Sequence, residues 1–248
     1  MRTADEPMPD ALTALRASLT ERLAALRGVS ADALPPALLD IMVQRVRVPG
    51  GDVFLVRPLH WEQLRHEEGG AGRPVPYWAR PWPSGLALAR ALAAERVGGA
   101  DLSGLRVLEL GCGLGAPSVV AARAGARVIA TDGASDAVAF AAHALALNEV
   151  DADVAHVDWA THGDALAARG PFDLVLAADV LYTRANVDAA VRLWPRLVAP
   201  EGALWLADPQ RAGARDALAA ARGTFAVQRH AQDGAVVLHR LVPRPSRS

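Results

Sequence analysis

The spacing of apolar residues changes partway along the chain and divides it into two regions. From Asp10, leucines recur in steps of three and four, which predicts an amphipathic helix with Asp10 as its N-cap and Gly28 at its end. A short second helix, and then two strands around a Pro-Gly-Gly turn, are expected before residue 60. Residues 65–76 are predicted to form a loop, and residues 1–75 as a whole an N-terminal extension.

Beyond Pro76, apolar runs typical of strands alternate with longer segments typical of helices. The first of these helices is expected to take Ser84 as its N-cap. Strands are expected at 106–111, 127–132, 153–159, 172–179 and 203–208, helices at 82–97, 115–125, 135–148, 186–198 and 212–223, and a closing hairpin at 224–231 and 235–242. This alternation predicts an α/β fold for residues 76–248, with a seven-stranded, mostly parallel sheet, helices on both faces and a C-terminal antiparallel hairpin.

A glycine-rich loop joins the first of these strands to the helix that follows it. The stretch "VLELGCGLGAPS" places Gly111, Gly113 and Gly115 at this junction, where the backbone can turn tightly and approach a ligand closely. Asp132 ends the next strand, about twenty residues on, which is the offset expected of an acid that holds ribose hydroxyls. The arrangement predicts a Rossmann-like nucleoside site, although a plain glycine turn followed by a helix-capping aspartate is an alternative.

The spacing of the glycines and a nearby acid bear on which cofactor is bound. A dinucleotide fold prefers the pattern G-x-G-x-x-G, with a helix N-terminus facing the pyrophosphate. Here the pattern is G-x-G-x-G, and Glu109 lies two residues before the first glycine. A carboxylate there suits the cationic groups of S-adenosylmethionine better than a pyrophosphate. Nicotinamide-dependent oxidoreduction is kept as an alternative.

The fourth expected strand ends in an acid, in the stretch "AADVLYTR". Ligands of open α/β sheets lie beyond the carboxyl ends of the strands, so Asp179 and Tyr182 are expected beside the cofactor, where a methyl acceptor would enter. Alternatively, Asp179 caps the next helix and Tyr182 packs under a loop.

Composition excludes several other classes of function. The 248 residues include 26 Lys and Arg against 27 Asp and Glu, so no nucleic-acid or membrane partner is expected. Cys112 is the only cysteine and the seven histidines show no close pair, so neither a disulfide nor a metal site is expected. The polar N-terminus and the lack of a long apolar run favour a cytoplasmic protein.

Taken together, the motifs of residues 76–242 resemble those of the seven-strand S-adenosylmethionine-dependent methyltransferases. This resemblance implies an acid near the adenine after the third strand, matched by Asp158 with Trp159 in "HVDWA"; otherwise Asp158 is an ordinary loop acid. The combination of "PYWARPWPSGLALARAL", "GCGLGAPS", "DWA" and "LAADVLY" is similar to the family-16 protein lysine methyltransferases. The resemblance to that group implies a catalytic acid-x-x-Tyr motif at Asp179 and Tyr182. It also implies cofactor binding by Ala178, just before this motif, and by Trp82.

The resemblance implies methylation of a protein lysine, with S-adenosylhomocysteine as the second product. Asp179 would position the amine, in a partly dry channel lined by Trp78, Trp82 and Tyr182. The later "ADPQR", with Asp208 and Arg211, resembles the branch that modifies the electron-transfer flavoprotein β-subunit, which implies that protein as a partner. A small-molecule N- or O-methyltransferase and a non-catalytic cofactor-binding module remain alternatives. The oligomeric state and the number of methyl groups transferred are left open.

Overall fold

A computed structural model describes residues 9–68 and 75–245 of the chain. Its main sheet has seven strands in the order β5-β4-β3-β6-β7-β9-β8, which confirms the predicted fold class. Strands β3 to β7 run parallel, whereas β9 pairs antiparallel with both β7 and β8. The strands are β3 (Arg106–Leu110), β4 (Arg127–Asp132), β5 (Asp153–His156), β6 (Phe172–Ala178), β7 (Val198–Asp208), β8 (Phe225–Asp233) and β9 (Val236–Pro243).

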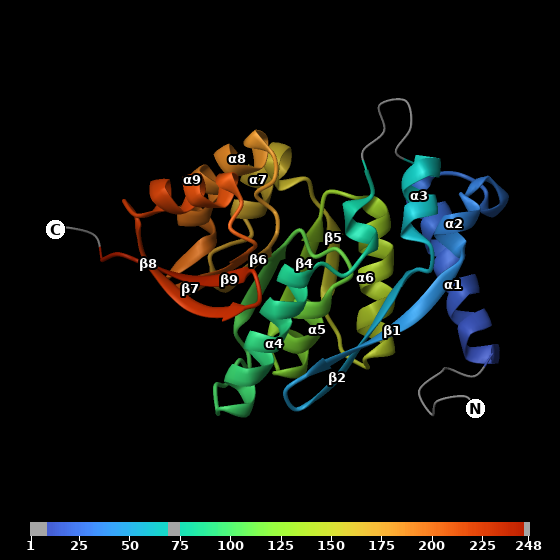
Figure 1. Cartoon of the computed structure of the whole chain (residues 1–248), viewed down its shortest axis with the longest axis horizontal. Helices are drawn as coiled ribbons and strands as arrows, with labels where there is room; N and C mark the ends of the chain where they lie inside the picture. Colours follow the sequence, from blue (N-terminus) through green and yellow to red (C-terminus); the bar gives the residue numbers. More distant parts are fainter. Residues whose placement is uncertain (1–8, 69–74, 246–248) are drawn as a thin grey trace.

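Helices cover both faces of this sheet (Figure 1). One face carries α4 (Pro83–Val97), α5 (Ala116–Arg123) and α6 (Ser135–Leu147), and the other carries α7 (Trp159–Ala167), α8 (Arg184–Leu197) and α9 (Ala212–Ala221). Neighbouring residues of β3 belong to different core clusters: Val107 packs with Phe140 of α6, and Leu108 with Trp194 of α8. Successive side chains of a strand point to opposite faces, so a strand buried on both sides is apolar throughout.

The N-terminal extension packs along the face that carries α5 and α6 (Figure 1). It consists of α1 (Pro9–Arg27), a 3₁₀ turn at Ala31–Ala33, α2 (Pro36–Leu39), the antiparallel pair β1 (Ile41–Val48) and β2 (Gly51–Pro58), and α3 (Trp61–Glu68). Leu19, Leu23 and Leu55 are fully buried and belong to the same core cluster as Phe140. The extension therefore contributes to the main core and does not have a core of its own.

Four local predictions are wrong. Asp10 lies in the first turn of α1, which begins at Pro9, and is therefore not its N-cap. Residues 65–68 belong to α3 rather than to a loop; residues 69–74 lie outside the described part of the chain. The strand predicted at residues 153–159 is β5 and stops at His156, and helix α7, which was not predicted, follows it. Ser84 does not cap α4, because Pro83, whose φ is preset for a helix, begins it one residue earlier and leaves Trp82 as the N-cap.

Candidate active site at the carboxyl ends of the strands

A cavity of about 690 Å³ opens at the carboxyl edge of the sheet. It lies where β3 and β6 are neighbours although β4 and β5 separate them in sequence. This reversal of strand order is the topological switch point at which open α/β sheets bind their ligands. The volume is within the range of small-molecule and cofactor sites.

The glycine loop after β3 forms one wall of this cavity. Gly111, Gly113 and Gly115 have φ values of 67°, 52° and 79°, in the left-handed region that favours glycine. A Cβ atom on Gly111 would lie 2.7 Å from Cγ1 of Val180, so no larger side chain fits there without displacing the loop after β6. The backbone therefore turns sharply beside the ends of both central strands, as the glycine spacing predicts.

Asp132, at the end of β4, binds the backbone of this loop. Its Oδ2 accepts a hydrogen bond from the Gly113 N–H and its Oδ1 one from the Ala134 N–H, both at 2.9 Å. Burial raises the pKa of the Asp132 carboxyl, while the two backbone donors act in the opposite direction. Each carboxylate oxygen has a further lone pair, so Asp132 can still accept hydrogen bonds from two ribose hydroxyls.

Glu109 is almost fully buried at the first turn of α5. Its Oε2 accepts hydrogen bonds from the Ser118 N–H, at 3.0 Å, and from the Ser118 hydroxyl. A carboxylate therefore already occupies the helix N-terminus that a pyrophosphate would need, which disfavours a dinucleotide and suits a cationic ligand. Burial raises the pKa of the Glu109 carboxyl to about 8, with a smaller contribution from the charge of Asp132.

Asp158 and Trp159 lie on the far side of Asp132, at the start of α7. Asp158 is the N-cap of this helix, because its carboxylate accepts the Ala160 N–H at 3.0 Å. Trp159 is buried behind it, and both residues line the cavity. Asp158 thus has a structural role and also borders the space in which the sequence predicts an adenine.

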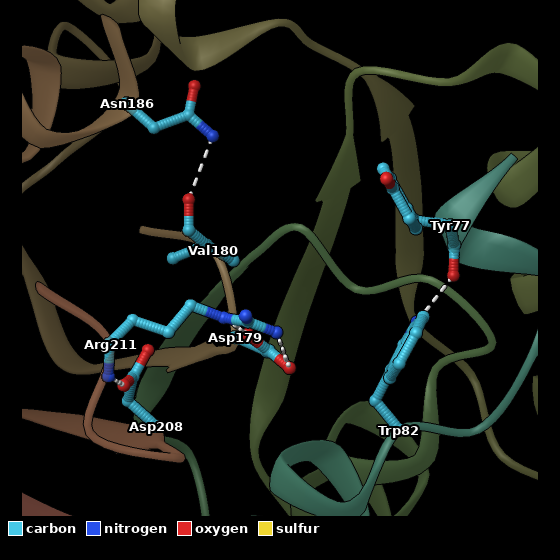
Figure 2. Close-up of polar contacts among 7 residues, drawn as sticks. All are labelled: Tyr77, Trp82, Asp179, Val180, Asn186, Asp208 and Arg211. Carbon is cyan, nitrogen blue, oxygen red and sulfur yellow. Dashed lines mark hydrogen bonds and ion pairs between the residues drawn. The ribbon is translucent and has the colours of Figure 1, made fainter. Parts of the chain in front are cut away.

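Asp179 lies at the opposite side of the cavity, directly after β6. Its Oδ1 and Oδ2 accept hydrogen bonds from Nε and Nη2 of Arg211, at 2.6 and 3.2 Å (Figure 2). Thr183, and not Asp179, caps α8, so the capping alternative is wrong. The loop between them is held by Asn186, whose Nδ2 donates to the Val180 carbonyl at 2.8 Å.

Aromatic rings gather at the rim of the cavity beside Asp179. The Tyr77 ring lies 5.8 Å from that of Tyr182 and 6.1 Å from that of Trp82, and Trp82 Nε1 donates to the Tyr77 carbonyl at 2.5 Å (Figure 2). Arg80 lies over the rings of Trp82 and Trp61, at 4.6 and 5.5 Å. Tyr182 is 53% exposed, yet partial desolvation and then nearby carboxylates raise the pKa of its phenol, which stays protonated at neutral pH.

The structure brings every predicted site residue to this one cavity. The residues are Trp82, Glu109, Gly111, Gly113, Gly115, Asp132, Asp158, Trp159, Ala178, Asp179 and Tyr182. The sequence did not single out Tyr77 or Asn186, which also line the cavity, nor the pairing of Arg211 with Asp179. Tyr77 belongs to the same stretch, "PYWARPWPSGLALARAL", as Trp78 and Trp82, so its position beside these tryptophans was the sequence signal that could have identified it.

The residues of the cavity fit S-adenosylmethionine. The buried Glu109 and the partly buried Asp132 flank a glycine loop with left-handed backbone, and the helix N-terminus is already bound by Glu109. Among residues 9–68 and 75–245, no group of three or more His, Cys, Asp or Glu side chains could hold a metal ion. Within the same residues, no helix is long and apolar enough to cross a membrane.

Comparison with known proteins agrees with this geometry. The 16S rRNA N2 methyltransferase of T. thermophilus, solved with AdoMet and guanosine, superposes with a TM-score of 0.61 over 87% of this chain and 53% of its own, at 20% identity, which supports the fold alone. Fold and site together define a class I S-adenosylmethionine-dependent methyltransferase. The lysine methyltransferase family model matches residues 77–218, more than half of the chain, and the chain belongs to that family.

Two curated relatives differ in their acceptors. The electron transfer flavoprotein beta subunit lysine methyltransferase of Danio rerio is 36% identical over 115 residues, 46% of this chain and 42% of its own length. The ubiquinone biosynthesis O-methyltransferase of Xanthomonas oryzae is also 36% identical, over 147 residues, 58% of this chain and 54% of its own. The chain thus spans about half the length of the curated relatives it matches.

Proposed function

We propose that this protein transfers a methyl group from S-adenosylmethionine to the side-chain nitrogen of a lysine in another protein. The observation that carries the proposal is the position of Asp179 and Tyr182. Both residues lie in the same cavity as the glycine loop and Asp132, on its other side. Membership of the lysine methyltransferase family supports the choice of acceptor.

On the cofactor side, we assign binding and orientation to the chain's own groups. Asp132 would accept hydrogen bonds from the ribose hydroxyls, and Glu109 would balance the cationic end. When bound, S-adenosylmethionine supplies a methyl group on a sulfonium and leaves as S-adenosylhomocysteine, the sulfur taking the electrons of the broken bond. The protein's part on this side is to hold the methyl group in line with the acceptor.

On the acceptor side, the lysine nitrogen must lose a proton before its lone pair can form the new bond. With a reference pKa near 10.4, this costs roughly 4–5 kcal/mol at pH 7. The rings of Trp78, Trp82 and Tyr182 line the cavity and would surround the aliphatic stem of the lysine and exclude water, which lowers the pKa of the ammonium. Asp179 would accept a hydrogen bond from the amine and orient its lone pair, and the released proton would pass to solvent.

The similarity to the enzyme from Danio rerio favours the electron-transfer flavoprotein β-subunit as the first protein acceptor to examine. A small-molecule oxygen acceptor is the second candidate. It is favoured by the equally identical and longer match to the ubiquinone biosynthesis O-methyltransferase. The two candidates share the cofactor half of the site and differ in what must enter beside Asp179.

Incubation of the purified protein with tritiated S-adenosylmethionine and a lysate of the source organism separates these candidates. A discrete labelled protein band, absent with Asp132→Ala and unchanged with the exposed-site control Asp151→Ala, is the expected result. The purified electron-transfer flavoprotein β-subunit of the same organism is tested in parallel, with mass spectrometry to locate the methyl-lysine. Label only in the small-molecule fraction would replace the protein acceptor by a metabolite. Cofactor binding without any transfer would indicate a non-catalytic binding module.

A further inference from the structure

Both members of the ion pair between Arg211 and Asp179 line the cavity. Two nitrogens of one guanidinium contact both oxygens of one carboxylate, at 2.6 and 3.2 Å, in the two-pronged geometry that arginine forms best. The Asp179 side chain is only 10% exposed, whereas that of Arg211 is 42% exposed. The carboxylate is therefore the more buried partner, and the dashed lines of Figure 2 show both of its contacts with the guanidinium.

The backbone on both sides of this pair is unusual. Asp179 has a φ of 56° and Gln210, immediately before Arg211, has a φ of 66°; Glu149 is the third non-glycine residue with positive φ in the described chain. A Cβ atom on Gly213 would lie 2.3 Å from the Leu181 carbonyl oxygen, so the start of α9 lies against the loop after β6. Residues held in such backbone conformations concentrate at functional sites, because the surrounding structure must maintain them.

A second carboxylate lies beside the pair. Ala178 of β6 pairs with Ala207 of β7, so Asp179 and Asp208 follow at the same level of the sheet. Asp208 Oδ1 accepts the Arg211 N–H at 2.6 Å, whereas its Oδ2 is buried without a hydrogen-bond partner. Burial raises the pKa of the Asp208 carboxyl, and the charge of Asp179 raises it further. The guanidinium of Arg211 thus pairs with Asp179 and interacts with Asp208 through its charge alone, because the hydrogen bond to Asp208 comes from the main-chain N–H.

We propose that Arg211 is a positioning residue that compensates the charge of Asp179, so that this carboxylate orients an acceptor amine without holding it as an ammonium ion. The inference rests on the proposed function, because it takes an amine as the acceptor. An unpaired carboxylate beside a lysine stabilises the ammonium form, which has no lone pair to react. A guanidinium paired with that carboxylate cancels most of this effect and stays charged at every working pH.

The other charged and titratable groups around the acceptor space do not supply this compensation. Those that line the cavity are Tyr77 and Arg80 before α4, Glu109 of β3, Cys112 after β3, Asp132 at β4, Asp158 at α7 and Tyr182 before α8, while Asp208 of β7 lies beside Asp179. Four of these are acids, and Arg80 lies over the rings of Trp61 and Trp82, away from Asp179. Loss of Arg211 therefore leaves an excess of negative charge at the point where the acceptor nitrogen binds.

The test uses two probes that need no knowledge of the natural acceptor. Both are adenosyl analogues in which an arm replaces the transferable methyl group; one arm ends in a primary amine and the other is an uncharged alkyl chain of equal length. The quantity measured is the ratio of their affinities at pH 7.5, by calorimetry. Because Arg211→Gln frees the Asp179 carboxylate, we expect the preference for the amine arm to rise roughly three- to tenfold.

Matched variants separate this effect from a general disturbance of the site. Arg215→Gln removes a guanidinium from the same segment, where it donates to the Gln210 carbonyl, and should leave the ratio unchanged. Arg211→Lys should give an intermediate ratio and shows whether the positive charge or only the fold is required. In an Asp179→Asn background, Arg211→Gln should change the ratio less than in the wild type, because no carboxylate is freed there.

Turnover supplies a second measurement that a purely structural role would not change. With the protein that the wild type labels, the acidic limb of the kcat profile should move up by about one pH unit in Arg211→Gln and stay in place in Arg215→Gln. If the amine preference of Arg211→Gln stays within twofold of wild type, the inference is wrong, whether or not a protein is methylated. If that preference rises but the wild type labels no protein, the inference stands and the protein acceptor is wrong.

Discussion

The two halves of the cavity use carboxylates in different ways. On the cofactor side, Asp132 and Glu109 are bound to backbone N–H groups of the glycine loop and of α5. On the acceptor side, Asp179 is bound to the flexible side chain of Arg211. The main chain therefore positions the acids of the cofactor half. In the acceptor half, the Arg211 side chain, which is 42% exposed, positions Asp179.

This difference indicates which half of the site the fold keeps constant and which half can change by substitution of side chains. Backbone donors cannot be replaced by substitution, so the cofactor half is rigid and suited to one invariant ligand. A side-chain partner can be exchanged without rebuilding a strand, so the acceptor half can be adapted to different substrates. The two curated relatives, which have a protein and a small-molecule acceptor, are consistent with such a division.

Asp132→Ala is the strongest test of the cofactor half. It removes a carboxylate that accepts two backbone hydrogen bonds and, as proposed, the ribose contacts. Each hydrogen bond to a charged group contributes about 1.5–3 kcal/mol, so we expect affinity for S-adenosylmethionine to fall at least about 100-fold. Calorimetric titration measures the loss, and Asp151→Ala is the exposed control. A loss smaller than fivefold would mean that Asp132 only shapes the loop.

Asp179→Asn and Tyr182→Phe test the acceptor half. Neither residue is assigned to the cofactor, so the dissociation constant of S-adenosylmethionine should stay within about twofold of wild type. The kcat for the protein acceptor should fall roughly 10- to 100-fold in Asp179→Asn and less in Tyr182→Phe. Asp188→Asn, an exposed acid on α8, is the matched control. Full turnover in both variants would contradict the acceptor assignment.

Glu109→Gln should change how cofactor binding depends on pH. The ligand-free protein has a Glu109 pKa of about 8, and a cationic ligand favours the ionised carboxylate, so binding releases a proton. Affinity should then increase almost tenfold per pH unit below that pKa and level off above it. Titrations at pH 6.5, 7.5 and 8.5 should show this slope in the wild type and a flat response in Glu109→Gln.

The same raised pKa gives a stability prediction of known sign. Between the ordinary value of 4.5 and about 8, the folded ligand-free protein keeps a proton that the unfolded chain has lost. Stability is therefore lost as pH rises through this window, and that contribution is absent in Glu109→Gln. A wild-type melting temperature that does not fall relative to Glu109→Gln between pH 5 and 8 would contradict the assignment.

Most of the fold, and the glycines and acids that line the cavity, could be predicted because both depend on local patterns. Glycines after a strand and acids at strand ends remain visible in the sequence wherever the chain folds. The pairing of Arg211 with Asp179 could not be predicted, because it depends on the adjacency of β6 and β7 and on left-handed backbone at Asp179 and Gln210. Helix α7 was missed because the capping role of Asp158 was not considered beside its role at the cofactor.

The N-terminal extension had no sequence motif, and its influence on the site is expected to be small. Arg27 at the end of α1 pairs with Asp136 of α6 through Nε and Nη2, at 2.9 and 2.5 Å. Asp136 is 8% exposed and lies close after the Asp132 loop. The extension thus contacts the cofactor half through Arg27, and it reaches the aromatic rim separately through Trp61 of α3, whose ring lies 6.4 Å from that of Trp82.

Arg27→Met should therefore produce the smallest effect, and only on one side of the comparison. Leaving the Asp136 carboxylate without this cation should lower the free energy of unfolding by about 1 kcal/mol and the melting temperature by roughly 2–4 °C. The same change should weaken S-adenosylmethionine binding about two- to threefold. Arg16→Met removes an exposed pair on the same helix and should cost less than about 0.5 kcal/mol. Because Arg27 contacts α6 and not the aromatic rim, KM for the acceptor should not change. A change in that KM with unchanged cofactor affinity would mean that the extension acts on the acceptor half, and the two halves would not be independent.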